Sequence, residues 1–188
     1  MMYTRTSLWR MPDDMISIKV PSLRVHLHAD RRLVYQVVTA FGGPSFEEGA
    51  SSKVLDRDGD RVLVEFDTPA KNFLGRRKIY RTVEWVSARE PDLIEFDGVD
   101  GPLPLLHDRF VLAEAGNCTN LIYESEFGVR GGIFGWLLGK LVVIRLMRRM
   151  MRDHMAELKQ SVESRSERSR VFPHPVCDEG AAFIAAGR

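Results

Sequence analysis

The sequence predicts an α+β protein in which a curved antiparallel sheet of about seven strands wraps around one long C-terminal helix. Between Ile16 and Val129 the hydrophobic residues mostly alternate with polar ones, a period of two that is typical of strands. From Ile133 to Glu163 the period becomes that of a helix. The glycine pair at 131–132 separates these two regimes, so we expect the sheet to end and the helix to begin there.

The first part of the strand region predicts one strand followed by a short helix. Hydrophobic residues alternate from Ile16 to Leu27, and Pro21 either interrupts this strand or places it at a sheet edge, because proline lacks an amide hydrogen. Asp30 is suited to cap the helix, since its carboxylate can accept hydrogen bonds from free amides of the first turn. Hydrophobic residues at helical spacing follow over 33–41, and the Gly-Gly-Pro segment 42–44 ends the helix.

Six further strand candidates follow with short connections. The Asp58-Gly59 and Gly116-Asn117 pairs are strong turn signals, because these residues tolerate positive φ. Consecutive strands with short connections form an antiparallel meander. The candidates are Lys53–Asp56, Arg61–Asp67, Arg77–Val86, Leu93–Asp97, Leu105–Ala113 and Thr119–Val129.

The long helix is predicted to cover the sheet with one hydrophobic face. About 30 residues at ~1.5 Å per residue span ~45 Å, and such a helix needs a large surface to pack against. Arg148 interrupts the hydrophobic series. The series consists of Leu137, Leu141, Ile144, Met151, Met155, Leu158 and Val162.

The chain of 188 residues is long enough for one ordinary domain and too short for two comfortable ones. We expect an N-terminal extension over 1–15, a ligand-binding domain over 16–163 and a disordered, charged tail over 164–188. Lys and Arg number 27 and Asp and Glu 26, so there is no surplus positive charge for nucleic-acid binding.

The sequence also predicts a soluble, cytoplasmic protein. The first 15 residues lack the apolar core of a signal peptide. The apolar stretch that starts at Gly131 is interrupted at Lys140, far short of the ~20 residues that cross a bilayer. The two cysteines, Cys118 and Cys177, lie in different settings and are not expected to form a disulfide framework, which favours a reducing compartment.

The element order and several motifs resemble the START-like SRPBCC superfamily and its helix-grip fold. The motifs are Gly101-Pro102, the segment His107-Asp108-Arg109-Phe110, and Thr119–Phe127 leading into the glycines and the long helix. The resemblance covers Val20–Glu163. That superfamily includes polyketide cyclases, coenzyme Q-binding proteins and plant allergen-type lipid carriers. The resemblance therefore implies a cavity between sheet and helix for a small hydrophobic ligand.

Candidate ligand-binding residues are those that share a strand or helix face with the predicted core. Polar members of this set would cost several kcal/mol each to bury unpaired, so they need partners in the protein, in water or in a ligand. A structural pair between Arg81 and Asp108 is the alternative, and the inward face of the fourth strand stays ambiguous. The candidates are Phe66, Arg81, Phe96, Asp108, Phe110, Tyr123, Ser125, Phe127, Trp136, Leu137, Leu141 and Ile144.

The preferred function is the binding or carriage of a lipid, isoprenoid or polyketide-like molecule. One alternative is a polyketide cyclase/dehydratase-type enzyme using the same cavity, and another is an accessory protein that acts through its long helix without a ligand. No catalytic residue, metal site or cofactor is predicted, since nucleophile elbows, phosphate loops and Cys-His metal spacings are missing.

The apolar start of the long helix, 131–139, predicts a transient membrane contact near Trp136. The alternative is that the N-terminal segment with Leu8, Trp9 and Met11 covers this surface.

Overall fold

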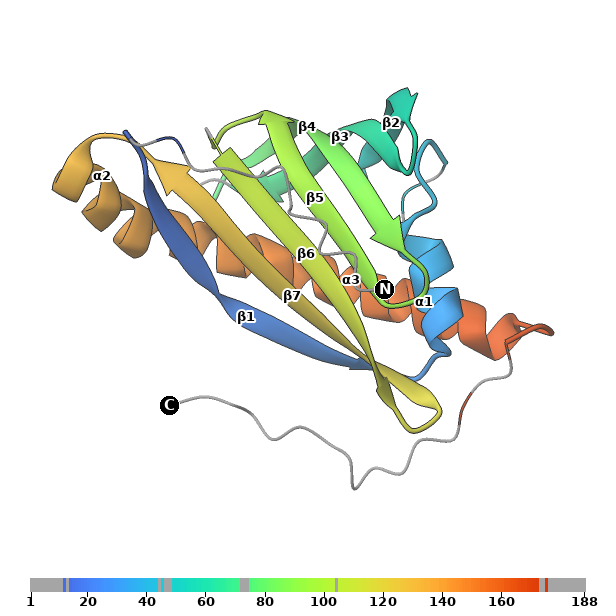
Figure 1. The fold of residues 1–188 in the computed structure, drawn as a ribbon. Coiled ribbons are helices and arrows are strands. Elements are labelled where there is room, and N and C mark those ends of the chain that lie inside the picture. Colours follow the sequence, from blue (N-terminus) through green and yellow to red (C-terminus); the bar gives the residue numbers. More distant parts are fainter. Residues whose placement is uncertain are drawn as a thin grey trace, which may run out of the picture.

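A single antiparallel sheet and the helices on one of its faces make up the described part of the chain (Figure 1). The computed structural model describes residues 12, 14–43, 45, 49–71, 75–103, 105–172 and 175. Within these residues seven strands pair in the order β1-β7-β6-β5-β4-β3-β2, which confirms the predicted meander. The strands are β1 (Ile16–Leu27), β2 (Ser51–Asp58), β3 (Arg61–Lys71), β4 (Arg77–Arg89), β5 (Leu93–Asp100), β6 (Leu105–Ala115) and β7 (Cys118–Val129).

Strand β1 returns to pair with the last strand and forms one edge of the sheet. Pro21 therefore lies in an edge strand, where a missing amide hydrogen costs no ladder hydrogen bond. The strand continues through the proline, and the register against β7 shifts between Val20 and Leu23. This irregularity is the local adjustment that the proline requires.

Helix α1 (Arg31–Val38) and a long C-terminal rod contribute the helical layer. The Asp30 side chain accepts a hydrogen bond from the Arg32 amide at 2.8 Å, as the predicted N-cap should. The rod consists of α2 (Gly132–Leu138), the π-helical segment η1 (Gly139–Val143) and α3 (Ile144–Arg168). Figure 1 shows it running across one face of the curved sheet.

The π-helical segment begins at Gly139, where the rod approaches the sheet closely. A Cβ atom added to Gly139 would lie 2.5 Å from Ile18 Cδ1 and 3.3 Å from Val129 Cγ1. Only glycine fits this approach without displacing a neighbour. The wider turn also takes up extra chain, so the hydrophobic face of the rod before and after η1 does not follow one continuous α-helical series.

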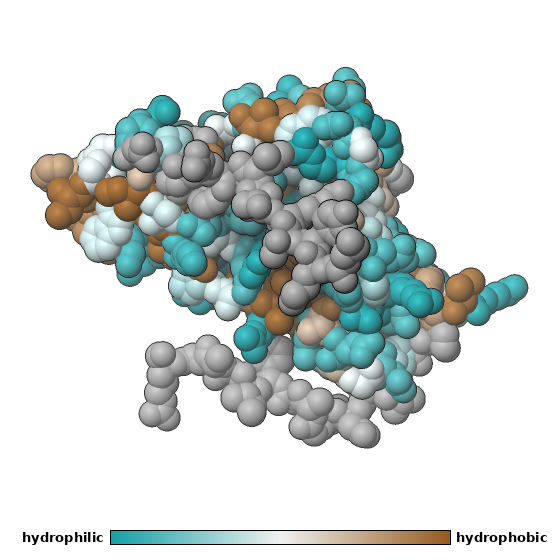
Figure 2. Space-filling view, viewed as in Figure 1, coloured by the Kyte–Doolittle hydropathy of each residue, from teal (hydrophilic) through white to brown (hydrophobic). Residues whose placement is uncertain are grey.

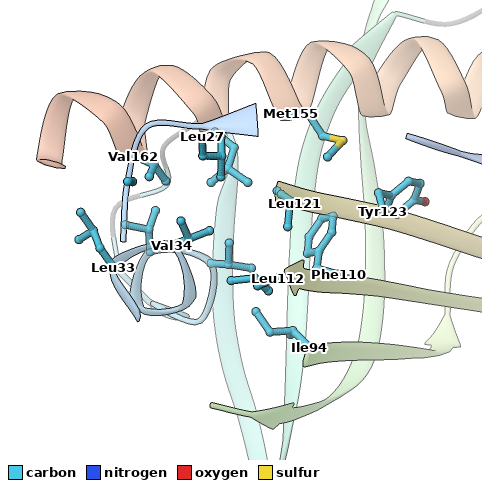
Figure 3. Close-up of a cluster of buried hydrophobic side chains, with 14 of the residues drawn as sticks. Leu27, Leu33, Val34, Ile94, Phe110, Leu112, Leu121, Tyr123, Met155 and Val162 are labelled. Carbon is cyan, nitrogen blue, oxygen red and sulfur yellow. The ribbon is translucent and has the colours of Figure 1, made fainter. Parts of the chain in front are cut away.

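The main core fills the space between the concave face of the sheet, α1 and α3 (Figure 3). Leu27, Val34, Ile94, Leu121 and Leu158 are all fully buried there. A second cluster lies toward α2 and consists of Ile18, Val20, Phe127 and Met147, with Leu103, Leu106, Val129, Trp136, Val143 and Ile144 packed against it.

The last helix continues beyond Glu163, where the charged tail was expected to begin. Residues 164–168, expected to belong to a disordered tail, continue α3 as far as Arg168. Phe172 is partly buried and packs against the main core, so the segment after Glu163 does have an apolar anchor. Residues 176–188 lie outside the described residues, as does the N-terminal segment with Leu8, Trp9 and Met11.

One expectation about the cysteines is wrong. Cys118, buried at the start of β7, is disulfide-bonded, and its partner lies outside the described residues. The expected cytoplasmic location therefore loses one of its supports and stays a prediction. No helix in the described part of the chain is both long and apolar enough to span a bilayer.

Candidate functional site: a cavity between sheet and helix

A cavity of about 400 Å³ lies between the concave face of the sheet and the C-terminal rod. Its helix side consists of long, adaptable side chains, among them Leu146, Met147, Met150 and Met151. Residues at the surface also line it, including the loop before β2 and the β5–β6 turn at Asp100, so the cavity opens to solvent between these two segments and α3.

A row of aromatic rings crosses the sheet side of the cavity. The ring centroids of consecutive members lie 5.8, 6.2, 5.7 and 5.5 Å apart, which are ordinary aromatic contact distances. The row arises because alternate residues of a strand face the same side and neighbouring strands align them. Figure 3 shows the end of the row at Phe110 and Tyr123, whose Cα atoms are register partners. Its members are Phe41, Phe66, Phe96, Phe110 and Tyr123.

A polar group lies at the end of this row. Asp108 of β6 is the register partner of Ser125 of β7, and Tyr123 is two residues away on the same face. Asp108 Oδ1, Tyr123 Oη and Ser125 Oγ are all buried, and none makes a hydrogen bond of standard geometry with the described residues. Buried polar atoms without partners are uncommon, and such atoms beside a cavity are available to a ligand.

Glu84 of β4 adds a second carboxyl group to the site. It is 8% exposed and lines the cavity together with Asp108. Its register partner is Gly98 of β5, which has no side chain to fill the space over that strand. A Cβ atom at Gly98 would lie 3.2 Å from Leu106 Cβ, so the glycine also permits close packing of β5 and β6.

The two carboxyl groups have pKa values near neutrality. Burial, and to a smaller extent the charge of Asp108, raise the pKa of Glu84 from 4.5 to about 7. Burial also raises the pKa of Asp108 from 3.8 to about 6, although the hydroxyls of Ser125 and Tyr123 lie close enough to lower it in part. Burial and the adjacent Asp108 hold the pKa of Tyr123 well above 10, so the phenol stays protonated.

Positive charge is scarce in this cavity. Among the described residues that line it, the basic side chains are Arg109 and His154. Arg109 forms an ion pair with Glu124. His154 enters from α3, and its charge lowers the pKa of Asp108. No group of three or more His, Cys, Asp or Glu among the described residues could hold a metal ion.

The structure brings only some of the predicted residues to the cavity. Those that line it are Phe66, Phe96, Asp108, Phe110 and Tyr123. Ser125 is buried directly beside them. Phe127, Trp136 and Ile144 instead belong to or pack against the second cluster.

Three predicted residues point away from the cavity. Leu137 and Leu141 are 47% and 53% exposed, on the outer side of the rod. Arg81 is also exposed and forms a two-pronged ion pair with Asp67, at 2.8 and 3.0 Å. The expectation that Arg81 lies with Asp108 is wrong, because Tyr80, Thr82 and Glu84, and not Arg81, are the residues of β4 that line the cavity.

Sequence reasoning missed Glu84, His154 and the methionines that line the cavity. The signal for Glu84 was present, because it alternates with Tyr80 and Thr82, but the competing face of β4 carries Ile79, Val83 and Trp85 and is equally hydrophobic. The helix residues were missed because the π-helical turn changes which side chains face the sheet.

Comparison with known proteins identifies the fold. No protein-family model and no curated protein matches the chain. The TTHA0849 protein of Thermus thermophilus matches with a TM-score of 0.62 at 20% identity, over 80% of this chain and 100% of that one. The Zhui aromatase/cyclase of a Streptomyces species matches with a TM-score of 0.62 at 14% identity, over 81% and 96% of the two chains.

A START superfamily protein of Mycobacterium smegmatis matches with a TM-score of 0.61 at 17% identity, over 78% of this chain and 98% of that one. At such identities these likenesses establish architecture and not activity. The chain has the START-like SRPBCC fold, which confirms the resemblance drawn from its sequence.

Proposed function

We propose that the protein binds a small, mainly apolar molecule of the lipid, isoprenoid or polyketide class, with a ring beside the aromatic row and a hydrogen-bond donor toward Asp108. The observation that carries this proposal is the row from Phe66 to Tyr123, which leads to buried acceptors without partners. Aromatic side chains favour flat, apolar ligands. A ligand hydroxyl or amine would give Asp108 Oδ1 a hydrogen bond of standard geometry, which the described residues do not give it.

The size of the cavity supports a ligand of this kind. Sites for small molecules are typically ~300–1,000 Å³ and apolar with few polar groups, and a cavity of about 400 Å³ lies within that range. An accessory protein that acts only through its long helix would have no need of an open interior. The cavity therefore argues against this alternative.

Two measurements test the binding function. Native mass spectrometry of the protein purified from its own host should detect a bound small molecule, and its mass would give the ligand class. Titration with a hydroxylated aromatic probe should then quench Tyr and Trp fluorescence. Phe110→Ala should weaken probe binding at least tenfold, whereas Ile79→Ala, 59% exposed on the outer face, should not change it. Equal binding by both variants would contradict the proposal.

The pair of near-neutral carboxyl groups favours a second candidate, an enzyme of the cyclase/dehydratase kind. Aldol cyclisation with loss of water needs a base to remove a proton and an acid to protonate the leaving hydroxyl. Asp108 and Glu84 have pKa values of about 6 and about 7, so one can be ionised while the other is protonated. Two of the similar structures are an aromatase/cyclase and a norcoclaurine synthase in complex with dopamine and hydroxybenzaldehyde.

Catalysis and binding can be separated with isosteric variants. A poly-β-ketone thioester incubated with the protein should lose the mass of water if the enzyme reading holds. Asp108→Asn and Glu84→Gln should then abolish product formation while probe binding remains within about tenfold of wild type. Binding without any turnover by the wild-type protein supports the carrier function alone.

A further inference from the structure

A continuous apolar surface is exposed at the start of the C-terminal rod. Figure 2 shows hydrophobic side chains gathered at the end of the molecule where Figure 1 labels α2. Phe134 is 81% exposed and Ile133 is 73% exposed, values that are unusual for such large apolar side chains. We call this surface the apolar patch; it consists of Ile133, Phe134, Leu137, Leu138, Leu141 and Val142.

The residues of the apolar patch recur at spacings of one, three and four. At about 100° per residue the spacings within α2 place Ile133, Phe134, Leu137 and Leu138 on one side of that helix. Leu141 and Val142 of η1 continue the patch and are 53% and 44% exposed. Trp136 is not part of the patch, because it is partly buried and packs against the second cluster, with Lys140 Nζ 4.8 Å from its ring centroid. The membrane contact expected near Trp136 would therefore be made by its exposed neighbours and not by Trp136 itself.

An arginine stripe follows directly after the apolar patch along the same rod. It consists of Arg145, Arg148, Arg149 and Arg152, which line one hollow together with Ile144 and Asp153. None of the four forms an ion pair with an acidic group of the described residues. Within the stripe, Arg152 Nε donates a hydrogen bond to the backbone carbonyl of Arg148 at 3.2 Å. Four guanidinium groups and one carboxylate give the hollow a net positive charge, which favours an anionic partner.

We propose that the apolar patch and the arginine stripe together dock the protein on the surface of an anionic lipid bilayer. Apolar side chains next to cationic ones are what an interfacial helix presents, with the former in the acyl boundary and the latter on the lipid phosphates. The rod would lie on the membrane and not cross it, since no described helix is long and apolar enough to span one.

The charges favour a bilayer over other partners. A second copy of the chain in a two-fold arrangement would bring two arginine stripes close together, and like charges would oppose that contact. A nucleic acid would neutralise the stripe but leave the apolar patch in water. An anionic membrane satisfies both surfaces at once.

Docking in this orientation would bring the cavity close to the membrane. Val143, Leu146 and Met147 line the cavity from the same stretch of rod that carries the exposed Arg145 and Arg149. Leu103 and Leu106 both line the cavity and pack in the second cluster with Trp136. The cavity and the proposed membrane surface therefore lie on opposite sides of one helix.

Vesicle co-sedimentation of the full chain tests the proposal. Wild-type protein should bind vesicles of phosphatidylcholine with phosphatidylglycerol, bind phosphatidylcholine alone at least tenfold more weakly, and lose affinity as salt rises. Replacing Arg145, Arg149 and Arg152 by Ala should weaken binding to the anionic vesicles on the order of 100-fold. Phe134→Ser with Leu138→Ser should weaken it at least tenfold.

Matched variants separate docking from folding and net charge. Arg24, Arg57 and Arg89 are exposed arginines outside the stripe, and the triple alanine variant removes the same charge. Ile79→Ser with Val99→Ser removes apolar residues that are each 59% exposed. Both controls should bind anionic vesicles as wild type does.

Several results would overturn the proposal. It fails if wild type ignores vesicles, if binding does not depend on phosphatidylglycerol, or if controls and test variants are weakened equally. It also fails if light scattering shows a dimer that Phe134→Ser dissociates, because the patch would then be a protein interface. Failure here would leave ligand binding in the cavity intact, since no test variant lines it.

Discussion

The buried carboxyl groups predict that the ligand-free protein becomes less stable as pH rises from about 5 to about 8. Glu84 has a pKa of about 7 in the folded chain against 4.5, and Asp108 about 6 against 3.8. Between these values the folded state binds more protons than the unfolded state, so stability falls with rising pH. Ionising either group in the folded protein costs about 3 kcal/mol, and the loss expected over this window is on the order of 4 kcal/mol.

Other groups also change the stability of the protein with pH, and one of them acts in the same direction as Glu84 and Asp108. The hydrogen bond to Asp97 raises the pKa of His107, which also lowers stability as pH increases. The lowered pKa values of Asp67 and Glu163 act at acid pH, where stability is lost as pH falls through them. The dependence on Glu84 and Asp108 must therefore be shown with variants.

Urea denaturation of refolded, ligand-free protein at several pH values supplies the test. The double variant Glu84→Gln and Asp108→Asn should lose most of the slope and exceed wild type in stability at about pH 8. Asp56→Asn, exposed on β2, should keep the wild-type slope. A wild-type stability that is flat or rises between about pH 5 and about pH 8 would refute the reasoning, as would a double variant with an unchanged slope.

Two further substitutions test the fold that holds the cavity. Phe172→Ala should reduce the free energy of unfolding by about 1–3 kcal/mol, because the ring packs on the main core. Val171→Ala is the control and should not reduce it, since Val171 is 78% exposed. An unchanged denaturation midpoint for Phe172→Ala would place this segment outside the domain. Gly135→Ala should lower the melting temperature by several degrees, because its Cβ would lie 1.8 Å from the Arg130 carbonyl oxygen. Gly43→Ala, whose nearest contact would be 3.6 Å, is the control, and equal melting of the two variants would contradict this placement.

The sheet could be predicted from sequence because its rule is local. Alternation gives each strand two faces, and short turns such as Asp58-Gly59 impose antiparallel neighbours. The inward faces of β3, β5, β6 and β7 were therefore assigned correctly, including Asp108 and Tyr123. Alternation does not decide which face of β4 points inward, because each face carries one charged residue, Arg81 on one and Glu84 on the other. In the structure the charged Arg81 faces solvent and forms an ion pair with Asp67, whereas Glu84 faces the cavity and has a raised pKa.

The helix face could not be predicted, because its period is not constant. A strict α-helical series through Leu137 and Leu141 leads to Arg148 at a core position. The π-helical segment changes which residues of α3 face the sheet. Met147 is therefore buried, and Arg148 is part of the arginine stripe. The interruption at Arg148 was the trace of this change in the sequence, but no local pattern located the π-helical segment at Gly139–Val143.

A passive apolar container and a site adapted to a polar group differ in their energetics. A container would be more stable with apolar residues in place of Glu84 and Asp108, since both are expensive to ionise where they lie. If the cavity binds the proposed ligand, the two carboxyl groups at one end of the aromatic row are placed to interact with a proton, a donor or a cation of that ligand. The pH slope distinguishes these roles. A cationic ligand would stabilise the ionised pair and reverse the slope of stability against pH. A ligand that accepts a hydrogen bond from a protonated carboxyl group would instead hold the pair protonated and make this slope steeper.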